Sequence, residues 1–346
     1  MISRLTRFVF SFVAVLGAVV IVLVYVDRER TPGFRSEEGK DVPGSVAVLE
    51  KVTLGGLDQS VLIRGKDNSS PVVLFLHGGP GMPMMYLAHQ FQRGLEDAFV
   101  TVQWDQRGAG KSYSRDVSVE TMNVRQFMSD ARELIDHLRD RFDHKKVFLV
   151  GHSWGSYLGM LLAHRHPDLF HAYIGVGQVT NPQRAREIQA RFIRKRALEE
   201  GREDAIAELD SLGVAVHEKW LFEFGGELYE STSWIPFLLV GLRSPEYTIF
   251  DCLKIAPGSN FSSAHMEYNV INGPLMEEVA TVDVPVYFFM GRHDYATPAE
   301  LANQYLDSIE APAKTMVWFE KSAHFPFFEE PEEFAEQMKR VLSEVQ

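Results

Sequence analysis

The pentapeptide Gly151-His152-Ser153-Trp154-Gly155 is the part of the sequence that points most directly to chemistry. It follows the apolar run KVFLV, a predicted buried strand, and precedes SYLGMLLAHRH, a predicted helix. A strand turns this sharply into a helix only where little side-chain bulk stands nearby, which glycine provides on both sides of Ser153. The pattern predicts Ser153 as a nucleophile exposed at the tip of the turn.

A serine hydroxyl is a weak nucleophile unless an imidazole accepts its proton during attack, and two later loops supply the groups for this. Asp294 follows the apolar run PVYFFM, and His324 follows TMVWF. Their chain order of serine, acid and histidine is the one that accompanies such a turn. Asp283 precedes its strand and would lie at the opposite sheet edge, while His293 lies on the acid's own loop. We therefore expect His324 as general base and Asp294 as the carboxylate that orients it.

Attack on a carbonyl also requires donors for the oxyanion that forms. One donor is expected to be the backbone N–H of Trp154, directly after the nucleophile. The other is expected from Gly78 and Gly79 in the loop HGGPG, which follows the apolar strand PVVLFL. His77 and His152 are interpreted as residues that pack these loops.

The elements that must position these residues alternate between strands and helices. Helices are predicted at 123–142, near 298–309 and from 331 onward, which favours a mostly parallel sheet covered by helices on both faces. The first two strands are expected to pair in antiparallel fashion around Gly55-Gly56. The predicted strands are 46–53, 59–64, 71–76, 98–104, 146–150, 285–290 and 315–319.

Residues 178–281 interrupt the alternation, being helical and charged at first and then irregular and aromatic. We interpret them as a cap inserted into a catalytic domain formed by residues 46–177 and 282–346. Such an insertion lies over the carboxyl ends of the strands and would select the substrates that enter.

Three motifs together resemble the prolyl aminopeptidase (proline iminopeptidase) group of the α/β-hydrolases. They are HGGPG at 77–81, DQRGAGKS at 105–112 and GHSWGS at 151–156. The similarity extends over roughly residues 46–346 and implies an α/β-hydrolase fold with the triad named above. Two features depart from the group: the elbow begins Gly-His instead of Gly-Gly, and an apolar segment precedes the domain.

In these aminopeptidases, glutamates of the cap bind the free α-amino group of the substrate. The resemblance implies the same use of a cap carboxylate here, and Glu267 in HMEYNVING lies in a segment similar to one of those regions. By sequence, Glu223, Glu227 and Glu230 are less well placed.

The amino terminus carries a long apolar segment. Phe8 to Val26 contains no charged residue and could cross a bilayer as a helix. Arg4 and Arg7 precede it, so the amino terminus is expected in the cytoplasm and the catalytic domain outside it. We therefore predict a single-pass membrane anchor at residues 1–30 and a tether at 31–45; secretion after signal cleavage is the alternative.

Composition narrows the function further. A net charge of −12 argues against nucleic acid as a partner, and the single cysteine, Cys252, excludes an internal disulfide. Neither a metal nor a cofactor is expected. The leading hypothesis is a membrane-anchored serine hydrolase that releases amino-terminal residues, preferably proline, from small peptides. The alternative is a carboxylic-ester or amide hydrolase with the same triad.

Overall fold

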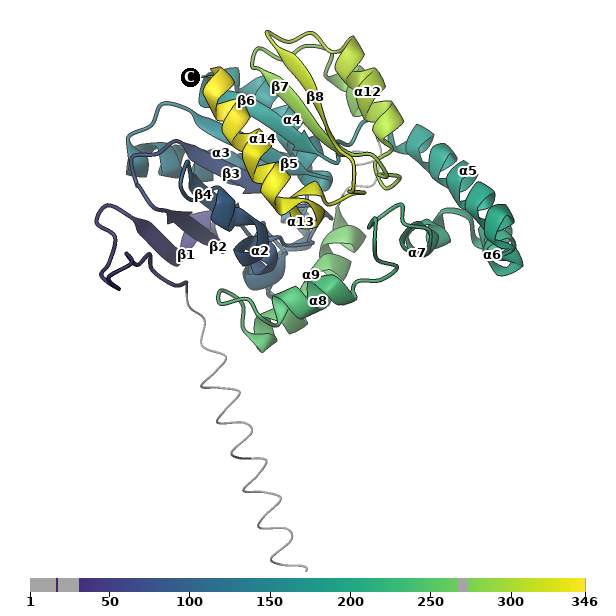
Figure 1. Cartoon of the computed structure of the whole chain (residues 1–346), viewed down its shortest axis with the longest axis horizontal. Coiled ribbons are helices and arrows are strands. Elements are labelled where there is room, and N and C mark those ends of the chain that lie inside the picture. Colours follow the sequence, from purple (N-terminus) through teal and green to yellow (C-terminus); the bar gives the residue numbers. More distant parts are fainter. Residues whose placement is uncertain (1–16, 18–30, 267–272, 346) are drawn as a thin grey trace, which may run out of the picture.

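The computed structural model describes residues 31–266 and 273–345, together with Gly17. An eight-stranded sheet lies at the centre of the molecule (Figure 1), with the strand order β1-β2-β4-β3-β5-β6-β7-β8. The strands are β1 (Val46–Leu54), β2 (Leu57–Gly65), β3 (Val72–Leu76), β4 (Val100–Trp104), β5 (Val147–His152), β6 (Phe170–Val176), β7 (Val286–Gly291) and β8 (Lys314–Phe319).

The pairing of the strands confirms the mostly parallel sheet. β1 pairs with β2, and β2 with β4, in antiparallel fashion, while every other neighbouring pair is parallel. The β1–β2 turn uses Gly55 and Gly56, both at positive φ, as predicted. The central strands β3 and β5 are buried along their whole length, as apolar strands covered on both faces must be.

Strand β6 was not predicted. It begins at Phe170, directly after the short turn Pro167–Leu169 that ends the preceding helix. Its sequence FHAYIGV contains His171 and Tyr173, whose side chains carry polar atoms. These residues interrupt the apolar run that would mark a buried strand. Burial between β5 and β7, rather than local pattern, therefore determines its conformation.

Helices cover both faces of the sheet, as predicted. One face packs against α3 (Val124–Phe142), α4 (Trp154–Arg165) and α12 (Ala299–Ser308). The other packs against α2 (Ala88–Phe91), α13 (Pro326–Glu329) and α14 (Pro331–Val345). Each layer has its own apolar core, and together they hold the strand ends that carry the predicted site residues.

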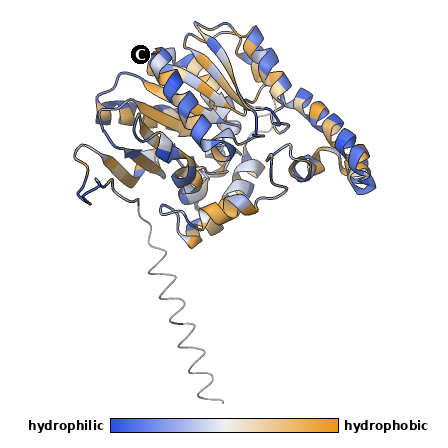
Figure 2. Ribbon diagram, in the orientation of Figure 1, coloured by the Kyte–Doolittle hydropathy of each residue, from blue (hydrophilic) through white to orange (hydrophobic). Residues whose placement is uncertain are grey.

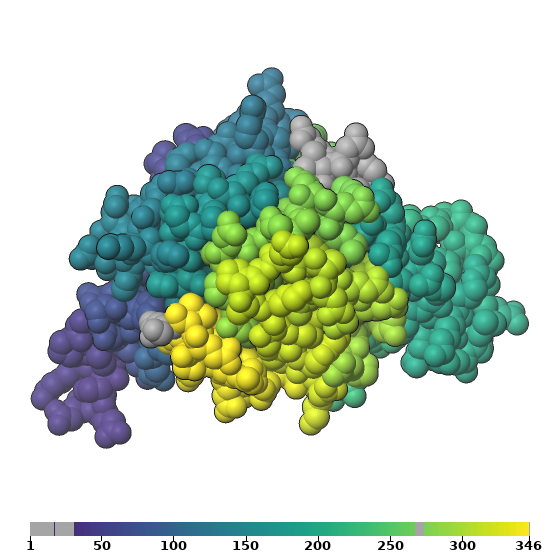
Figure 3. Space-filling model, turned by 90° about the horizontal axis from the view of Figure 1, so that it is seen from above, coloured from purple at the N-terminus to yellow at the C-terminus, as the bar shows by residue number. Residues whose placement is uncertain are grey.

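The predicted cap interval is helical between β6 and β7. Figure 3 shows its first helices, in teal, projecting at the end of the molecule opposite the purple amino-terminal strands. These helices have a small apolar core of their own around Trp220. The helices are α5 (Pro182–Glu200), α6 (Glu203–Leu212), α7 (His217–Glu223), α8 (Ile235–Gly241), α9 (Ile249–His265) and α11 (Leu275–Glu278).

The expected tether is not detached from the domain. Phe34 is buried and lies under the guanidinium of Arg64, 4.8 Å from its ring centre, and Arg64 also donates to Thr31 Oγ1 at 2.6 Å. The polar, glycine-rich composition of this stretch did not predict that Phe34 would be buried against Arg64.

The predicted membrane span, Phe8 to Val26, lies outside the described residues except for Gly17. In the described part of the chain, no helix is both long enough and apolar enough to cross a membrane.

A buried ion pair joins the first turn of the sheet to α3. Asp130 is fully buried and accepts hydrogen bonds from Arg107 at 2.9 and 3.1 Å, from Gln59 at 2.7 Å and from Gln126 at 2.7 Å. Arg107 also donates to the carbonyls of Leu54 and Gly55. One buried carboxylate thus joins side chains of β2, of α3 and of the loop after β4.

We expect Asp130→Ala to lower the free energy of unfolding by about 3–5 kcal/mol, because it leaves the Arg107 charge buried without a carboxylate to balance it. Asp136→Ala on the same helix is the control: it removes half-exposed ion pairs to Arg132 and Arg139 and should cost about 0.5 kcal/mol or less. Denaturant unfolding of the purified full-length protein measures both values. Equal losses would show that the buried pair has no special weight.

Candidate active site

Ser153 occupies the turn between β5 and α4 that the sequence predicted. Its backbone has φ 52° and ψ −118°, a conformation that is rare for a residue with a side chain. The Ser153 N–H donates to the carbonyl of Val176 at 3.0 Å, and its carbonyl accepts from the hydroxyl of Ser156 at 2.6 Å. These bonds hold the strained residue so that its side chain lines a pocket.

Asp294 and His324 come together as predicted, on the loops after β7 and β8. The Nδ1 atom of His324 lies 3.0 Å from Oδ2 of Asp294. The N–H and hydroxyl of Thr297 donate to the same carboxylate at 2.8 and 2.9 Å. The bond at Nδ1 leaves Nε2 as the nitrogen available to a neighbouring hydroxyl.

The carboxylates around His324 stabilise a positive charge on its ring. Burial by itself lowers the pKa of His324, but the Asp294 carboxylate, with support from Glu227 and Glu329, raises it. The site therefore stabilises the imidazolium that forms when the ring accepts a proton.

Gly78 and Gly79 line the same pocket as Ser153 and His324. A Cβ atom on Gly78 would lie 3.2 Å from the Cβ of Ser153, so the loop backbone passes directly beside the serine. Trp154 is the first residue of α4, where helix N–H groups have no partner within the helix. The three predicted oxyanion donors are thus grouped around Ser153, and their role remains a prediction.

Gly177, which the sequence analysis did not single out, is packed against the histidine and its acid. It has φ 53°, and a Cβ there would lie 2.7 Å from both Cε1 and Nδ1 of His324 and 3.3 Å from Oδ2 of Asp294. The available signal was the pair of glycines that flank Val176 at the end of the unpredicted strand β6.

His77 and His152 are buried, in keeping with a packing role. His77 donates to the carbonyl of Gly78 and accepts from the N–H of Gln106, and burial lowers its pKa to about 4. His152 lies 2.9 Å from the carbonyl of His324, and burial holds its pKa well below the usual range. Both rings are therefore neutral supports of the loops.

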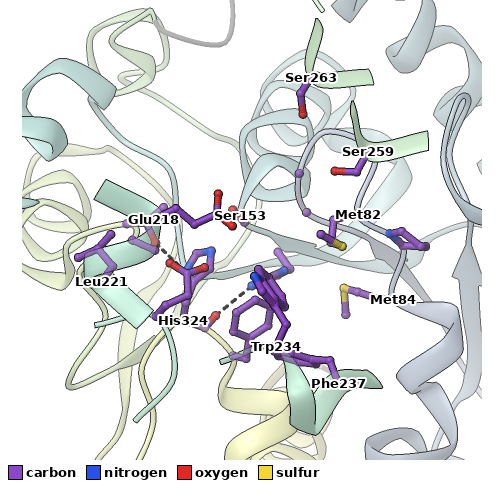
Figure 4. A pocket seen from close by; sticks show the side chains of 18 of the residues that line it. Met82, Met84, Ser153, Glu218, Leu221, Trp234, Phe237, Ser259, Ser263 and His324 are labelled. Atoms are coloured by element: carbon purple, nitrogen blue, oxygen red, sulfur yellow. Dashed lines mark hydrogen bonds between the residues drawn. The ribbon is translucent and has the colours of Figure 1, made fainter. Parts of the chain in front are cut away.

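A cavity of about 410 Å³ opens in front of Ser153 (Figure 4). The core side contributes Met82, Met84 and Phe325, and the cap side contributes Leu221, Trp234 and Phe237. In Figure 4, Met82, Met84 and Trp234 lie around the space beside Ser153 and His324, and Ser259 and Ser263 of α9 lie farther out. The cap thus forms one wall of the cavity.

Two cap carboxyls line this cavity. Glu227 is buried beside His324, whose N–H donates to its backbone carbonyl, and burial raises the pKa of Glu227 to about 7. Glu218 of α7 is exposed and close enough to raise that pKa further. Glu223 and Glu230 are exposed and lie outside the cavity lining.

Glu267, the cap glutamate favoured from sequence, lies outside the described residues. In residues 31–266 and 273–345, no group of three or more His, Cys, Asp or Glu side chains is arranged to hold a metal ion. Ser153 is placed for nucleophilic attack, His324 for proton transfer and Glu227 for the binding of a positive charge.

The chain is similar in sequence to proteins named as aminopeptidases. The chain is 32% identical over 308 residues to probable aminopeptidase YbaC of Bacillus subtilis (strain 168), covering 86% of this chain and 96% of that one. It is 25% identical to a proline iminopeptidase of Heyndrickxia coagulans over 76% of this chain and 87% of the relative.

The crystal structure of a proline iminopeptidase of Mycobacterium smegmatis has the same fold, with a TM-score of 0.65 at 18% identity, covering 86% of this chain and 98% of that one. The family model described as "Alpha/beta hydrolase family" matches residues 73–337. The chain therefore belongs to the α/β hydrolase family.

Proposed function

We propose that this protein is a membrane-anchored serine aminopeptidase that releases amino-terminal residues, preferably proline, from small peptides. The observation that carries the proposal is the shared cavity: Ser153, His324 and the buried Glu227 line it, and Asp294 holds His324 from outside the lining. The relatives named aminopeptidase and proline iminopeptidase support the same class of substrate.

In the proposed reaction, Ser153 Oγ attacks the carbonyl carbon of the first residue while His324 Nε2 takes the hydroxyl proton. The N–H groups of Trp154 and of the Gly78–Gly79 loop stabilise the oxyanion. The protonated His324 then donates its proton to the leaving amine, and an acyl-enzyme forms on Ser153. Water, activated by His324, releases the amino acid and restores the serine.

Glu227 provides the proposed contact for the substrate's free α-ammonium group. A buried carboxyl is more stable as an anion when a cation pairs with it, and an ammonium at this place would lower the pKa of Glu227 that burial has raised. Glu218 adds negative charge at the same side of the cavity. This assigns to Glu227 the role that the resemblance suggested for Glu267, which stays a second candidate.

The anchor belongs to the proposal on the strength of the sequence. Residues 8–26 carry no charge, and two arginines precede them. This pattern favours a single span with the amino terminus in the cytoplasm and the catalytic domain on the other side of the membrane.

Ser153→Ala tests the nucleophile. We expect kcat on prolyl anilide to fall by about 10³-fold or more, because no neighbouring group can form the acyl-enzyme in place of the serine. The far-ultraviolet circular dichroism and the unfolding midpoint should stay close to wild type. Activity near the wild-type level would refute Ser153 as nucleophile.

Gly177→Ala tests the geometry of the histidine. The new methyl group must displace His324 or Asp294, and we expect kcat to fall by about 10²-fold because small displacements of the base are costly. Gly201→Ala is the matched control, since Gly201 also has positive φ (67°) but nothing within 4 Å of the added Cβ. If the two variants lose activity equally, backbone strain rather than contact with His324 explains the loss.

Glu227→Gln tests recognition of the amino group. Loss of the buried charge partner should cost about 2–5 kcal/mol of transition-state stabilisation, so kcat/KM for free-amine prolyl anilide should fall roughly thirtyfold or more. The hydrolysis of a neutral acetate ester should change little. Glu223→Gln, at an exposed carboxylate paired with Arg202, is the control and should leave both rates unchanged.

The outcomes for the two substrates separate the hypotheses. Equal losses on amine and ester would give Glu227 a positioning role near His324 instead. If the wild-type enzyme cleaves acetyl-prolyl anilide as fast as the free-amine compound, the aminopeptidase proposal fails. The ester or amide hydrolase alternative then takes its place.

A further inference from the structure

Helix α8 and the first half of α9 expose an apolar surface that the proposed reaction does not use. Phe250 and Leu253 are each 67% exposed. In Figure 2, the apolar colour runs along α8 at the lower side of the molecule. This surface, named here the α8–α9 face, consists of Ile235, Leu238, Leu239, Leu242, Ile249, Phe250 and Leu253. Apolar groups clustered in this way usually mark a contact site.

The charged side chains within the α8–α9 segment differ in exposure. Between residues 235 and 260, the acidic side chains Glu246 and Asp251 are buried, Arg243 is exposed, and Lys254 is partly exposed and pairs with Asp251 at 3.0 Å. This segment therefore exposes no carboxylate, although the chain carries a net charge of −12. An apolar face with an exposed arginine and no exposed carboxylate in the same segment matches a bilayer that contains anionic lipid.

The α8–α9 face also lies next to the point where the amino-terminal segment joins the domain. Thr31 Oγ1 donates to Glu246, in the connection between α8 and α9, at 3.3 Å. Arg64 fixes the same place by donating to Thr31 and to the carbonyl of Pro32, both at 2.6 Å. Figure 1 shows α8 and α9 on the side of the molecule where the described chain begins at Thr31.

Chain length then limits how far the membrane can be from this face. Val26 ends the apolar segment, and five residue steps separate it from Thr31. Even a fully extended chain covers at most about 18 Å in five steps. If Phe8 to Val26 spans a bilayer, the bilayer surface must therefore lie close to the domain on this side.

We propose that the α8–α9 face docks on the surface of the same membrane, with Phe250 and Leu253 in its interfacial region. The proposal rests on the proposed anchor. Opposite this face, Trp234 directly before α8, Phe237 of α8 and Ser259 of α9 line the cavity in front of Ser153. Docking consequently holds one wall of the substrate cavity against the lipid surface.

Site-directed spin labels on the full-length protein test the docking. In a Cys252→Ser background, single cysteines are introduced as Phe250→Cys, Leu253→Cys and, as control, Leu198→Cys on α5, where the leucine is 68% exposed. The labelled proteins are reconstituted in vesicles of phosphatidylcholine and phosphatidylglycerol. We expect the ratio of oxygen to aqueous nickel-chelate collisions to be several-fold higher at 250 and 253 than at 198.

Other outcomes overturn the proposal in recognisable ways. Labels at 250 and 253 that stay as accessible to the nickel chelate as the label at 198, in protein that resists alkaline extraction, refute docking while leaving the anchor intact. Protection that appears without lipid and grows with protein concentration assigns the face to a second copy of the chain.

Failure of the anchor is distinguishable from failure of docking. If alkaline extraction releases the chain from the vesicles, the anchor proposal is wrong. Flotation of the same protein with vesicles then tests whether the α8–α9 face binds lipid without an anchor. Co-flotation with protected labels supports docking, and protein left at the bottom of the gradient overturns it.

Discussion

The active site depends on the close approach of helix α4 to strand β3 beneath Ser153. A Cβ on Gly155 would lie 2.1 Å from the carbonyl oxygen of Leu76, and a Cβ on Gly151 would lie 2.3 Å from the carbonyl of Gly155. No side chain fits at either position without moving backbone. The two glycines therefore let the turn close tightly, and the positive φ of Ser153 follows from that closure. The same approach places Ser153 beside Gly78, at the end of β3.

The loop that carries the histidine is held by a different means, the carboxylate of Glu329 in α13. Glu329 accepts from the N–H groups of Ala323 at 2.9 Å and Phe325 at 3.3 Å, on either side of His324, and from Tyr229 of the cap. Such bonds to a charged acceptor are worth about 1.5–3 kcal/mol each. Burial raises the pKa of Glu329 to about 7, so this clamp is strongest above that pH. The loop of the base and the cap are thus fixed by one side chain.

The sequence predicts those parts of the site that short segments determine. Ser153, Asp294 and His324 each follow an apolar strand in a recognisable order, and the structure brings the acid and the histidine within 3.0 Å. Gly177 was not predicted and Glu227 was judged less well placed than Glu267, because their contacts with His324 are made across long sequence separations. Strand β6 and the packing of Phe34 were missed for the same reason.

The motif DQRGAGKS shows why a family resemblance gives fold more readily than substrate. Several of its residues join the core to the cap. Lys111 pairs with Asp251 of α9 at 2.6 Å in a buried setting, Asp105 accepts from the hydroxyl of Tyr247, and Ser262 of α9 donates to the carbonyl of Gly108.

These contacts set where α8 and α9 stand relative to Ser153, and a buried pair of this kind has few alternative arrangements. Trp234, directly before α8, and Phe237 of α8 line the cavity, while Phe250 and Leu253 of α9 are exposed. None of these four side chains makes the contacts of the attachment, so they can differ without disturbing it. The same motif can therefore hold caps of different chemistry, and substrate choice has to be read from the cavity that each cap encloses.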